Sequence, residues 1–212
     1  MNEKSVRSVH SMKAREKIIQ AADELFYERG FANTGVNDLL ERSGVHKGSF
    51  YKYFREKGDV GLEYLRLRRE RNAELFRTLT NRYPDFSQVV KAWVVLLRKE
   101  AKADRLKGCP FAMFANQTFS SPLSLDEKQF SDAKEQINEV VCDWEEIFSS
   151  YLRNTATSKK DTLSETEIQS FVRRIVILYE GSIQVYFMTG KEEYLKEFQE
   201  SLLMLGKFYG RA

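Results

Sequence analysis

Apolar residues recur at helical spacing along most of the chain, separated by polar segments with proline or glycine. The first stripe falls at positions i, i+3, i+4, i+7 and i+8 and ends before Gly30, as expected of one face of a helix; it comprises Ile18, Ala21, Ala22, Leu25 and Phe26. Two short helices are expected next, and then longer ones at about residues 57–81, 89–97, 111–119, 125–153, 168–188 and 195–209. The pattern therefore predicts an all-α fold of about nine helices.

The stretch from Thr34 to Lys57 predicts two short helices joined by a tight turn. Thr34 is placed to cap the first helix, and Gly44 ends it because glycine tolerates the left-handed conformation of a sharp turn. The positions expected to face the core are Val36, Leu39, Leu40, Val45, Phe50 and Phe54. This arrangement is typical of a helix-turn-helix, whose second helix enters the major groove of DNA.

The outward positions of the second helix carry chemistry suited to DNA. Lysine and tyrosine reach phosphates, serine donates to phosphates or base edges, and a glycine lets the backbone approach closely. The expected DNA-binding residues are Lys47, Gly48, Ser49, Tyr51 and Lys52, with Tyr53, Thr34 and Lys57 at the phosphates. A solvated amphipathic helix pair is the simpler alternative, but here the charges and the aromatic rings share one face.

The same residues resemble a known family. The run Thr-Gly-Val-Asn-Asp-Leu-Leu, the run Ser-Gly-Val-His-Lys-Gly-Ser-Phe-Tyr-Lys-Tyr-Phe and then Lys57 are similar to the DNA-binding domain of TetR-family bacterial repressors, from about Arg15 to Leu65. The resemblance implies a three-helix head on a helical ligand-binding body. Two positions depart from the family pattern. His46 leaves the cap of the second helix open, and Gly58 would loosen the start of the next helix.

Composition and charge fit this division. The chain has 212 residues, 42% hydrophobic and 31% charged, as in ordinary globular proteins. Residues 1–57 hold 11 Lys+Arg against 8 Asp+Glu, so residues 58–212 hold 34 − 11 = 23 against 31 − 8 = 23. A DNA-binding domain at 1–57 and an effector-binding and dimerisation domain at 58–212 are therefore expected.

Location and membrane contact can also be addressed from the sequence. No apolar run approaches membrane length, and no signal-peptide pattern opens the chain, so no membrane partner is expected. Two cysteines do not make a disulfide framework, which favours the cytoplasm.

Two further basic segments have open interpretations. Residues 1–12 lack apolar periodicity and are expected to form a flexible arm, with a minor-groove contact as the alternative. A group of arginines at positions 66, 68, 69 and 71 could be a second phosphate-binding patch. A solvated helix face is favoured instead, because Glu63, Glu70 and Glu74 lie at pairing distance.

The last two helices have more apolar surface than one core requires. Residues 168–188 are apolar around most of the helix, and Gly181 would let another backbone come close. In the final helix, apolar residues alternate at steps of three and four, as in a helix–helix seam; they are Leu195, Phe198, Leu202, Leu205 and Tyr209. A homodimer formed through these two helices is expected, and a palindromic double-stranded DNA operator would require it.

Large side chains from the middle helices could line a mainly apolar pocket for a small-molecule effector. The candidates are Trp93, Leu97, Phe111, Phe114, Asn116, Gln117, Trp144, Phe148, Tyr179 and Tyr186. For any single residue, a packed aromatic core without a cavity is the simpler interpretation. The family resemblance favours the pocket.

The two cysteines have different expected roles. The segment Lys107-Gly-Cys-Pro-Phe resembles a motif in a TetR branch that includes electrophile- and oxidant-responsive repressors, which makes Cys109 a candidate redox sensor. A helix start after a basic run would lower the pKa of its thiol. The alternative is a small hydrophobic residue beside a helix-starting proline. Cys142 is expected in the core.

Catalysis is not indicated. The sequence has no Gly-rich phosphate loop, no metal-ligand spacing and no visible set of nucleophile and base, so neither a metal nor a cofactor is expected. The favoured function is a DNA-binding transcriptional regulator, a dimeric repressor released by a small apolar or electrophilic effector. The alternative is an architectural DNA-binding protein that responds to no effector.

Overall fold

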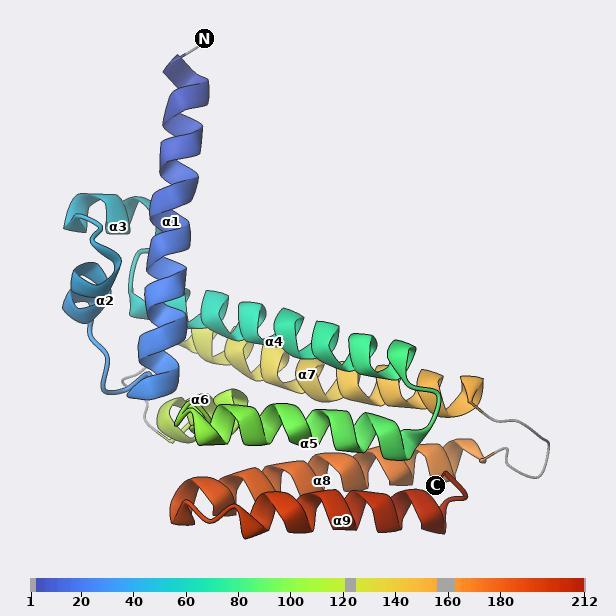
Figure 1. The fold of residues 1–212 in the computed structure, drawn as a ribbon. Coiled ribbons are helices and arrows are strands. Elements are labelled where there is room, and N and C mark those ends of the chain that lie inside the picture. The colour runs from blue at the N-terminus through green and yellow to red at the C-terminus, as the bar shows by residue number, and fades with distance from the viewer. Residues whose placement is uncertain (1–2, 121–124, 156–162, 212) are drawn as a thin grey trace. The chain divides into compact units, whose positions relative to one another are not determined.

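The computed structural model describes residues 3–120, 125–155 and 163–211, with side chains from residue 13 onward. Within these residues the chain forms nine helices and no strand (Figure 1), which confirms the predicted all-α class. The helices are α1 (Glu3–Glu28), α2 (Val36–Ser43), α3 (Lys47–Tyr53), α4 (Lys57–Arg82), α5 (Phe86–Lys102), α6 (Pro110–Thr118), α7 (Glu127–Asn154), α8 (Glu165–Thr189) and α9 (Glu193–Phe208).

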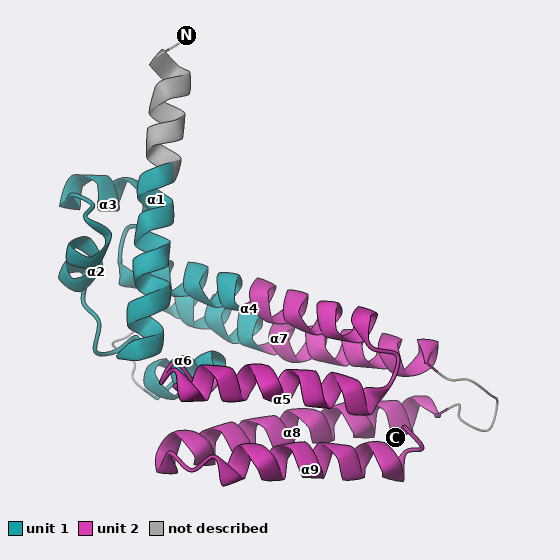
Figure 2. Ribbon diagram, viewed as in Figure 1, with its two compact units in different colours: residues 1–68, 110–137 teal, residues 69–109, 138–212 magenta. Residues whose placement is uncertain are grey.

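Two compact units share the chain (Figure 2). Unit 1 comprises Met1–Arg68 with Pro110–Ile137, and unit 2 comprises Arg69–Cys109 with Asn138–Ala212. The segment from α6 into α7 thus packs with the N-terminal helices, although it lies far from them in sequence. Whether residues 1–57 form an independent domain stays a prediction. So does the flexible arm at 1–12, which lies outside the residues whose side chains are described.

Aromatic rings close the core of unit 1. α1 packs against both α2 and α3. The Phe31 ring meets Phe26 at 5.1 Å between centroids and Phe114 of α6 at 4.8 Å. A Cβ at Gly61 would lie 2.8 Å from the Phe31 ring, so only glycine fits at this point of α4. These ring contacts explain why α6 belongs to this unit.

The core of unit 2 is an aromatic cluster centred on Phe76. The Phe76 ring lies 4.7 Å from Trp93 and 4.6 Å from Trp144, in edge-on geometry. Trp93 also stacks on Tyr179 at 5.3 Å. Edge-on and offset contacts of this kind add to the stabilisation from burial alone. The cluster therefore joins α4, α5, α7 and α8 around one point.

Local signals define the ends of several helices. Gly44 adopts the left-handed conformation (φ 65°) and ends α2, as predicted. α8 starts with a capping box, in which the Ser164 hydroxyl accepts from the Glu167 amide and the Glu167 carboxylate accepts from the Ser164 amide. The expected cap at Thr34 is wrong, because Gly35 occupies the cap position of α2 and its amide donates to Asp38.

The described helices differ in how much apolar surface they leave uncovered. Cys142 is exposed on α7, so its expected place in the core is wrong; it falls on the outward side of a helix whose other face is buried.

No helix in the described ranges is both long and apolar enough to cross a lipid bilayer.

Candidate nucleic-acid interface

The helix-turn-helix is held together from its inner side. The side chains of Leu39 and Phe50 have no solvent exposure, and Phe54 retains 4%. Between the helices, the Val45 amide donates to the Ser43 hydroxyl, and the Ser49 and Phe50 amides donate to the carbonyl of His46. The turn and the start of α3 are thereby fixed, although His46 makes no side-chain cap.

The outer side of α3 is open. Lys47, Gly48, Tyr51 and Lys52 are exposed, while Ser49 and Tyr53 are half-buried. Half of the Tyr51 surface is exposed, so its ring and hydroxyl are accessible from solvent. A Cβ at Gly48 would meet nothing within 4 Å, so the fold itself does not require glycine there.

The two lysines on this side have no carboxylate partner. Among the described residues, no ion pair engages Lys47 or Lys52. An exposed cation without a counter-charge remains available to a phosphate. The structure therefore brings four of the predicted DNA-binding residues, Lys47, Gly48, Tyr51 and Lys52, to one exposed side of α3, with the half-buried Ser49 and Tyr53 at its edge. We call these six residues the outer face of α3.

The other two predicted residues lie within the fold. Thr34 has 1% exposure and its hydroxyl donates to the carbonyl of Gly30 at 2.9 Å. The Lys57 ammonium donates to the carbonyl of Phe31 at 2.9 Å and lies 4.3 Å from the centre of the Phe31 ring. Burial lowers the pKa of Lys57, and the charge of Asp38 opposes that shift. Both side chains secure the loop before α2, so a phosphate contact from either stays a prediction.

Three of the four clustered arginines of α4 form ion pairs with carboxylates of the described residues. Arg66 pairs with Glu63 at 3.1 Å, Arg68 pairs with Asp23, and Arg69 pairs with both Asp143 and Glu139. The interpretation as a paired helix face is thus favoured over a phosphate-binding patch. The expected partners were on the same helix, whereas Arg68 and Arg69 reach carboxylates of α1 and α7. A hydrogen bond from Asp143 raises the pKa of Arg69, consistent with a tight pair.

The residues predicted to line an effector pocket divide between the two units. In unit 2, the rings of Trp93, Trp144, Phe148 and Tyr179 pack around the Phe76 cluster. The Trp144 indole also donates to the Asn72 side chain. Leu97 is buried and Tyr186 half-buried. This dense ring packing is what the alternative, a core without a cavity, predicts.

The candidates in unit 1 have structural contacts as well. Phe111 and Phe114 are buried, and Asn116 is exposed. The Gln117 side-chain oxygen accepts a hydrogen bond from the Ala32 amide at 3.0 Å, so its carboxamide is committed to the loop before α2. No pattern in the local sequence indicated this contact, because its partners are 85 residues apart.

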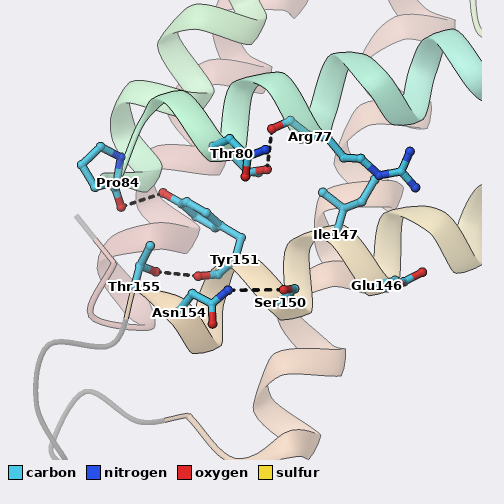
Figure 3. A pocket seen from close by; sticks show the side chains of 10 residues that line it. Arg77, Thr80, Pro84, Glu146, Ile147, Ser150, Tyr151, Asn154 and Thr155 are labelled. Carbon is cyan, nitrogen blue, oxygen red and sulfur yellow. Dashed lines mark hydrogen bonds between the residues drawn. The ribbon is translucent and has the colours of Figure 1, made fainter.

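A pocket of about 400 Å³ opens in unit 2 where the ends of α4 and α7 lie beside each other (Figure 3). The Tyr151 hydroxyl donates to the Pro84 carbonyl at 2.9 Å, and burial raises the pKa of Tyr151, so this donor keeps its proton. None of the predicted effector residues lines it. Its lining is mainly polar: Arg77, Thr80, Asn81, Pro84, Glu146, Ile147, Ser150, Tyr151, Asn154 and Thr155.

Cys109 is buried, with 4% exposure, and directly precedes α6. Its thiol is hydrogen-bonded to the carboxyl of Glu180 in α8, and burial raises the pKa of Glu180. A thiol placed beside a carboxyl group does not gain the electropositive surroundings that the basic run suggested. The sequence signal located a cysteine at a helix start but could not reveal Glu180.

The last two helices leave apolar side chains in solvent. α8 and α9 lie side by side, and α9 also packs on α5 (Figure 1). On the packed side, Leu195, Phe198 and Leu202 have no exposure. On the opposite side, large apolar side chains expose between 46% and 77% of their surface: Ile177, Phe187, Met188, Met204 and Phe208. The two-sided character predicted for these helices is therefore present.

Sequence comparison supports the assignment of the N-terminal helices. Residues 18–63 match the family model described as bacterial regulatory proteins, tetR family. The chain is 26% identical over 150 residues to the HTH-type transcriptional regulator LmrA of Bacillus subtilis, covering 69% of this chain and 74% of LmrA. It is 29% identical over 99 residues to the HTH-type transcriptional repressor NemR of Escherichia coli, covering 45% of this chain and 49% of NemR. The match to NemR thus spans about half of that protein.

Solved structures share the fold. The reduced form of E. coli NemR superposes with a TM-score of 0.70 at 21% identity, covering 89% of this chain and 95% of NemR. SCO4454, a TetR-family transcriptional regulator from Streptomyces coelicolor, superposes with a TM-score of 0.74 at 15% identity, covering 93% and 96%. At these identities the likeness concerns the fold alone.

A helix-turn-helix with an exposed basic and aromatic surface, on an all-helical chain with these relatives, defines a DNA-binding transcriptional regulator rather than an enzyme. More narrowly, the N-terminal residues 18–63 match the tetR family model, and the fold of the chain is that of solved TetR-family regulators.

Proposed function

We propose that this protein is a repressor that binds a palindromic operator as a homodimer and leaves it when a small effector binds. The observation that carries the proposal is the outer face of α3, where the exposed Tyr51 ring lies beside two lysines that pair with no carboxylate of the described residues. Lysines supply phosphate contacts, and the serine, the tyrosines and the glycine backbone between them can meet base edges or sugars. Thr34 and Lys57 contribute indirectly, because their hydrogen bonds to Gly30 and Phe31 secure the loop that precedes α2.

Dimerisation through α8 and α9 completes the DNA-binding unit. One α3 helix reads only a half-site, so a symmetric operator needs two copies. The exposed apolar side of α8 and α9 supplies a self-complementary surface of the kind that a twofold interface requires. A Cβ atom at Gly181 would meet nothing within 4 Å inside its own subunit, so there is room for a partner helix there.

The effector is proposed to be small and either apolar or electrophilic. Cys109 supports an electrophile, because its thiol already donates to Glu180, a carboxyl whose raised pKa makes it a better proton acceptor than usual. Addition would form a bond from Sγ to the electrophilic carbon while the thiol proton passes to Glu180. The adduct would disturb the contact between Cys109 and Glu180 of α8 and so favour a conformation with lower operator affinity.

Footprinting of the purified protein on the DNA flanking its own gene tests the core of the proposal. Two protected half-sites about 10 base pairs apart, or a multiple of that spacing, are expected from two α3 helices in successive major grooves. Protection of a single half-site at all protein concentrations would contradict the dimer. Protection without sequence preference would favour the architectural alternative, which the dense packing of the predicted pocket residues also supports.

The role of Cys109 has a separate test. Cys109→Ser should keep operator affinity, because Cys109 is buried within unit 2 and is not part of the outer face of α3, and it should lose release by a thiol-reactive electrophile such as N-ethylmaleimide. Cys142→Ser, at the exposed cysteine, is the matched control and should be released like the wild type. Persistent release of Cys109→Ser would refute the sensor.

A further inference from the structure

Gly58, one of the two departures from the family pattern, lies under a side chain from a distant helix. It is the second residue of α4 and is buried. A Cβ atom at this position would overlap the carboxamide of Gln129 in the first turn of α7. Gln129 itself has only 3% exposure. Glycine at position 58 therefore does not simply loosen the helix start, because its missing side chain leaves the space that Gln129 fills.

Hydrogen bonds fix Gln129 in that space. Its side-chain nitrogen donates to a carboxylate oxygen of Glu56 and to one of Asp59, both at 2.9 Å. Its side-chain oxygen accepts from the Asp126 amide at 3.2 Å, and its own amide donates to the Asp126 carboxylate at 2.7 Å. Both hydrogens of the carboxamide are thus used, and the side chain cannot turn away without breaking both of these hydrogen bonds.

The two carboxylates belong to the segment that follows α3 directly. Glu56 and Asp59 flank the start of α4, and the second oxygen of Asp59 accepts from the Arg55 amide at 2.8 Å. Arg55 lies two residues after the end of α3 at Tyr53. Gln129 consequently holds the exit of the helix-turn-helix to the first turn of α7, within unit 1.

A similar contact occurs at the entrance. The Gln117 carboxamide of α6 accepts from the Ala32 amide in the loop before α2. It also covers Gly30, where a Cβ atom would overlap it. Both ends of the helix-turn-helix are therefore held by a glutamine that lies over a glycine, and both glutamines come from the segment 110–137 of unit 1.

We infer that Gln129 and Gln117 are positioning residues that set the orientation of α2 and α3 for operator recognition, and that Gly58 is required because Gln129 occupies its side-chain space. This inference rests on the proposed function, since operator recognition is its readout. Neither glutamine is expected to touch DNA. Base readout depends on placing side chains to within about 0.5 Å, whereas non-specific attraction to phosphates does not. Misplacement should therefore lower specific affinity alone.

Four variants test the exit contact: Gly58→Ala, Gln129→Ala, the combination of both, and Gln129→Glu. Affinity is measured at one salt concentration on the operator and on an unrelated duplex, and the thermal midpoint is measured without DNA. Gly58→Ala should weaken operator binding about tenfold and leave binding to the unrelated duplex unchanged. Gln129→Ala should do the same. In the combined variant the overlap is gone, so the loss should not exceed that of Gln129→Ala, and alanine should raise the thermal midpoint relative to that variant.

Gln129→Glu separates charge from shape. It keeps the size of the side chain but removes two donors and adds a third carboxylate beside Glu56 and Asp59, so it should lose more operator affinity than Gln129→Ala. Gln88→Ala, an exposed glutamine on α5, is the control and should behave as the wild type. At the entrance, Gln117→Ala should weaken operator binding in the same direction, and an unchanged affinity would overturn the part assigned to Gln117.

Three results would overturn the role of Gln129. They are unchanged operator affinity in Gly58→Ala, additive losses in the combined variant, and equal losses on the operator and on the unrelated duplex. Failure of the wild type to bind any operator would instead refute the proposed function. The thermal midpoints of Gly58→Ala, Gln129→Ala and their combination would then still test the contact itself, because they need no DNA.

Discussion

The lysines of α3 and the arginines of α4 show two uses of positive charge. Lys47 and Lys52 are exposed and engage no carboxylate among the described residues, whereas Arg66, Arg68 and Arg69 each pair with one or two. In sequence, the arginine run is the denser of the two. A count of basic residues alone would therefore favour α4 over α3 as the candidate DNA-binding helix. What distinguishes a phosphate-binding surface is the absence of a nearby counter-charge, because a paired guanidinium must give up its carboxylate before it can bind DNA.

The largest effect should come from removing the unpaired charges. Lys47→Ala combined with Lys52→Ala removes four phosphate contacts from a dimer, two per subunit. Operator affinity should fall about a hundredfold, and the slope of log affinity against log salt should flatten by about 3.6, at about 0.9 per contact. Titrations between roughly 50 and 200 mM salt measure this. Lys91→Ala, an exposed lysine on α5, is the control. An unchanged slope in the double variant would remove α3 from the DNA interface.

An intermediate effect, on stability rather than on DNA binding, is expected at Arg69. Its side chain is 29% exposed and binds Asp143 and Glu139, so Arg69→Ala leaves two carboxylates without their partner. The free energy of unfolding should fall by about 1–3 kcal/mol, while the operator affinity of the folded protein stays the same. Urea unfolding at a fixed protein concentration measures the loss.

A double-mutant cycle makes the Arg69 prediction specific. Asp143→Ala alone should also destabilise, and its combination with Arg69→Ala should lose less than the sum of the two. Additive losses would show that the pair contributes little and would weaken the contrast with α3.

The smallest effect is expected at Arg66, at the exposed end of the arginine run. Arg66 is 47% exposed, and its partner Glu63 also pairs with Arg15. Arg66→Ala should change the free energy of unfolding by no more than about 0.5 kcal/mol. It should also leave the salt dependence of operator binding unaltered. A flatter salt dependence in this variant would mean that DNA reaches α4 as well, and the contrast between the two helices would be lost.

Local patterns in the sequence were sufficient for most of the fold. The stripes of apolar residues located the helices, and Gly44 marked the end of α2 because its left-handed conformation is a local property. The outward set on α3 was also predictable, since Phe50 and Phe54 fix which side of a short helix faces inward. For the proposed DNA-binding surface, therefore, periodicity and residue type contain most of the information.

What the sequence could not give depends on residues that are far apart. Gly58 looked like a weak helix start because Gln129, which fills its space, is 71 positions away. The hydrogen bond from Lys57 to the Phe31 carbonyl was likewise not predictable, because the two residues are 26 positions apart. The spacing of the aromatic residues in the middle helices could not distinguish a packed core from a ligand cavity. Spacing alone does not show whether rings such as Trp93 and Tyr179 are in contact.

The two tryptophans of the chain, Trp93 and Trp144, both belong to the ring cluster around Phe76. Indole fluorescence consequently reports on unit 2, and unit 1 is silent at these wavelengths. A thermal scan that follows tryptophan emission would show one sharp transition, that of unit 2. It would not detect a loosening of the helix-turn-helix, whether caused by heat or by a substitution such as Gly58→Ala. The substitution Tyr27→Trp, at a ring of α1 that packs against Arg68, would add a fluorescent reporter to unit 1.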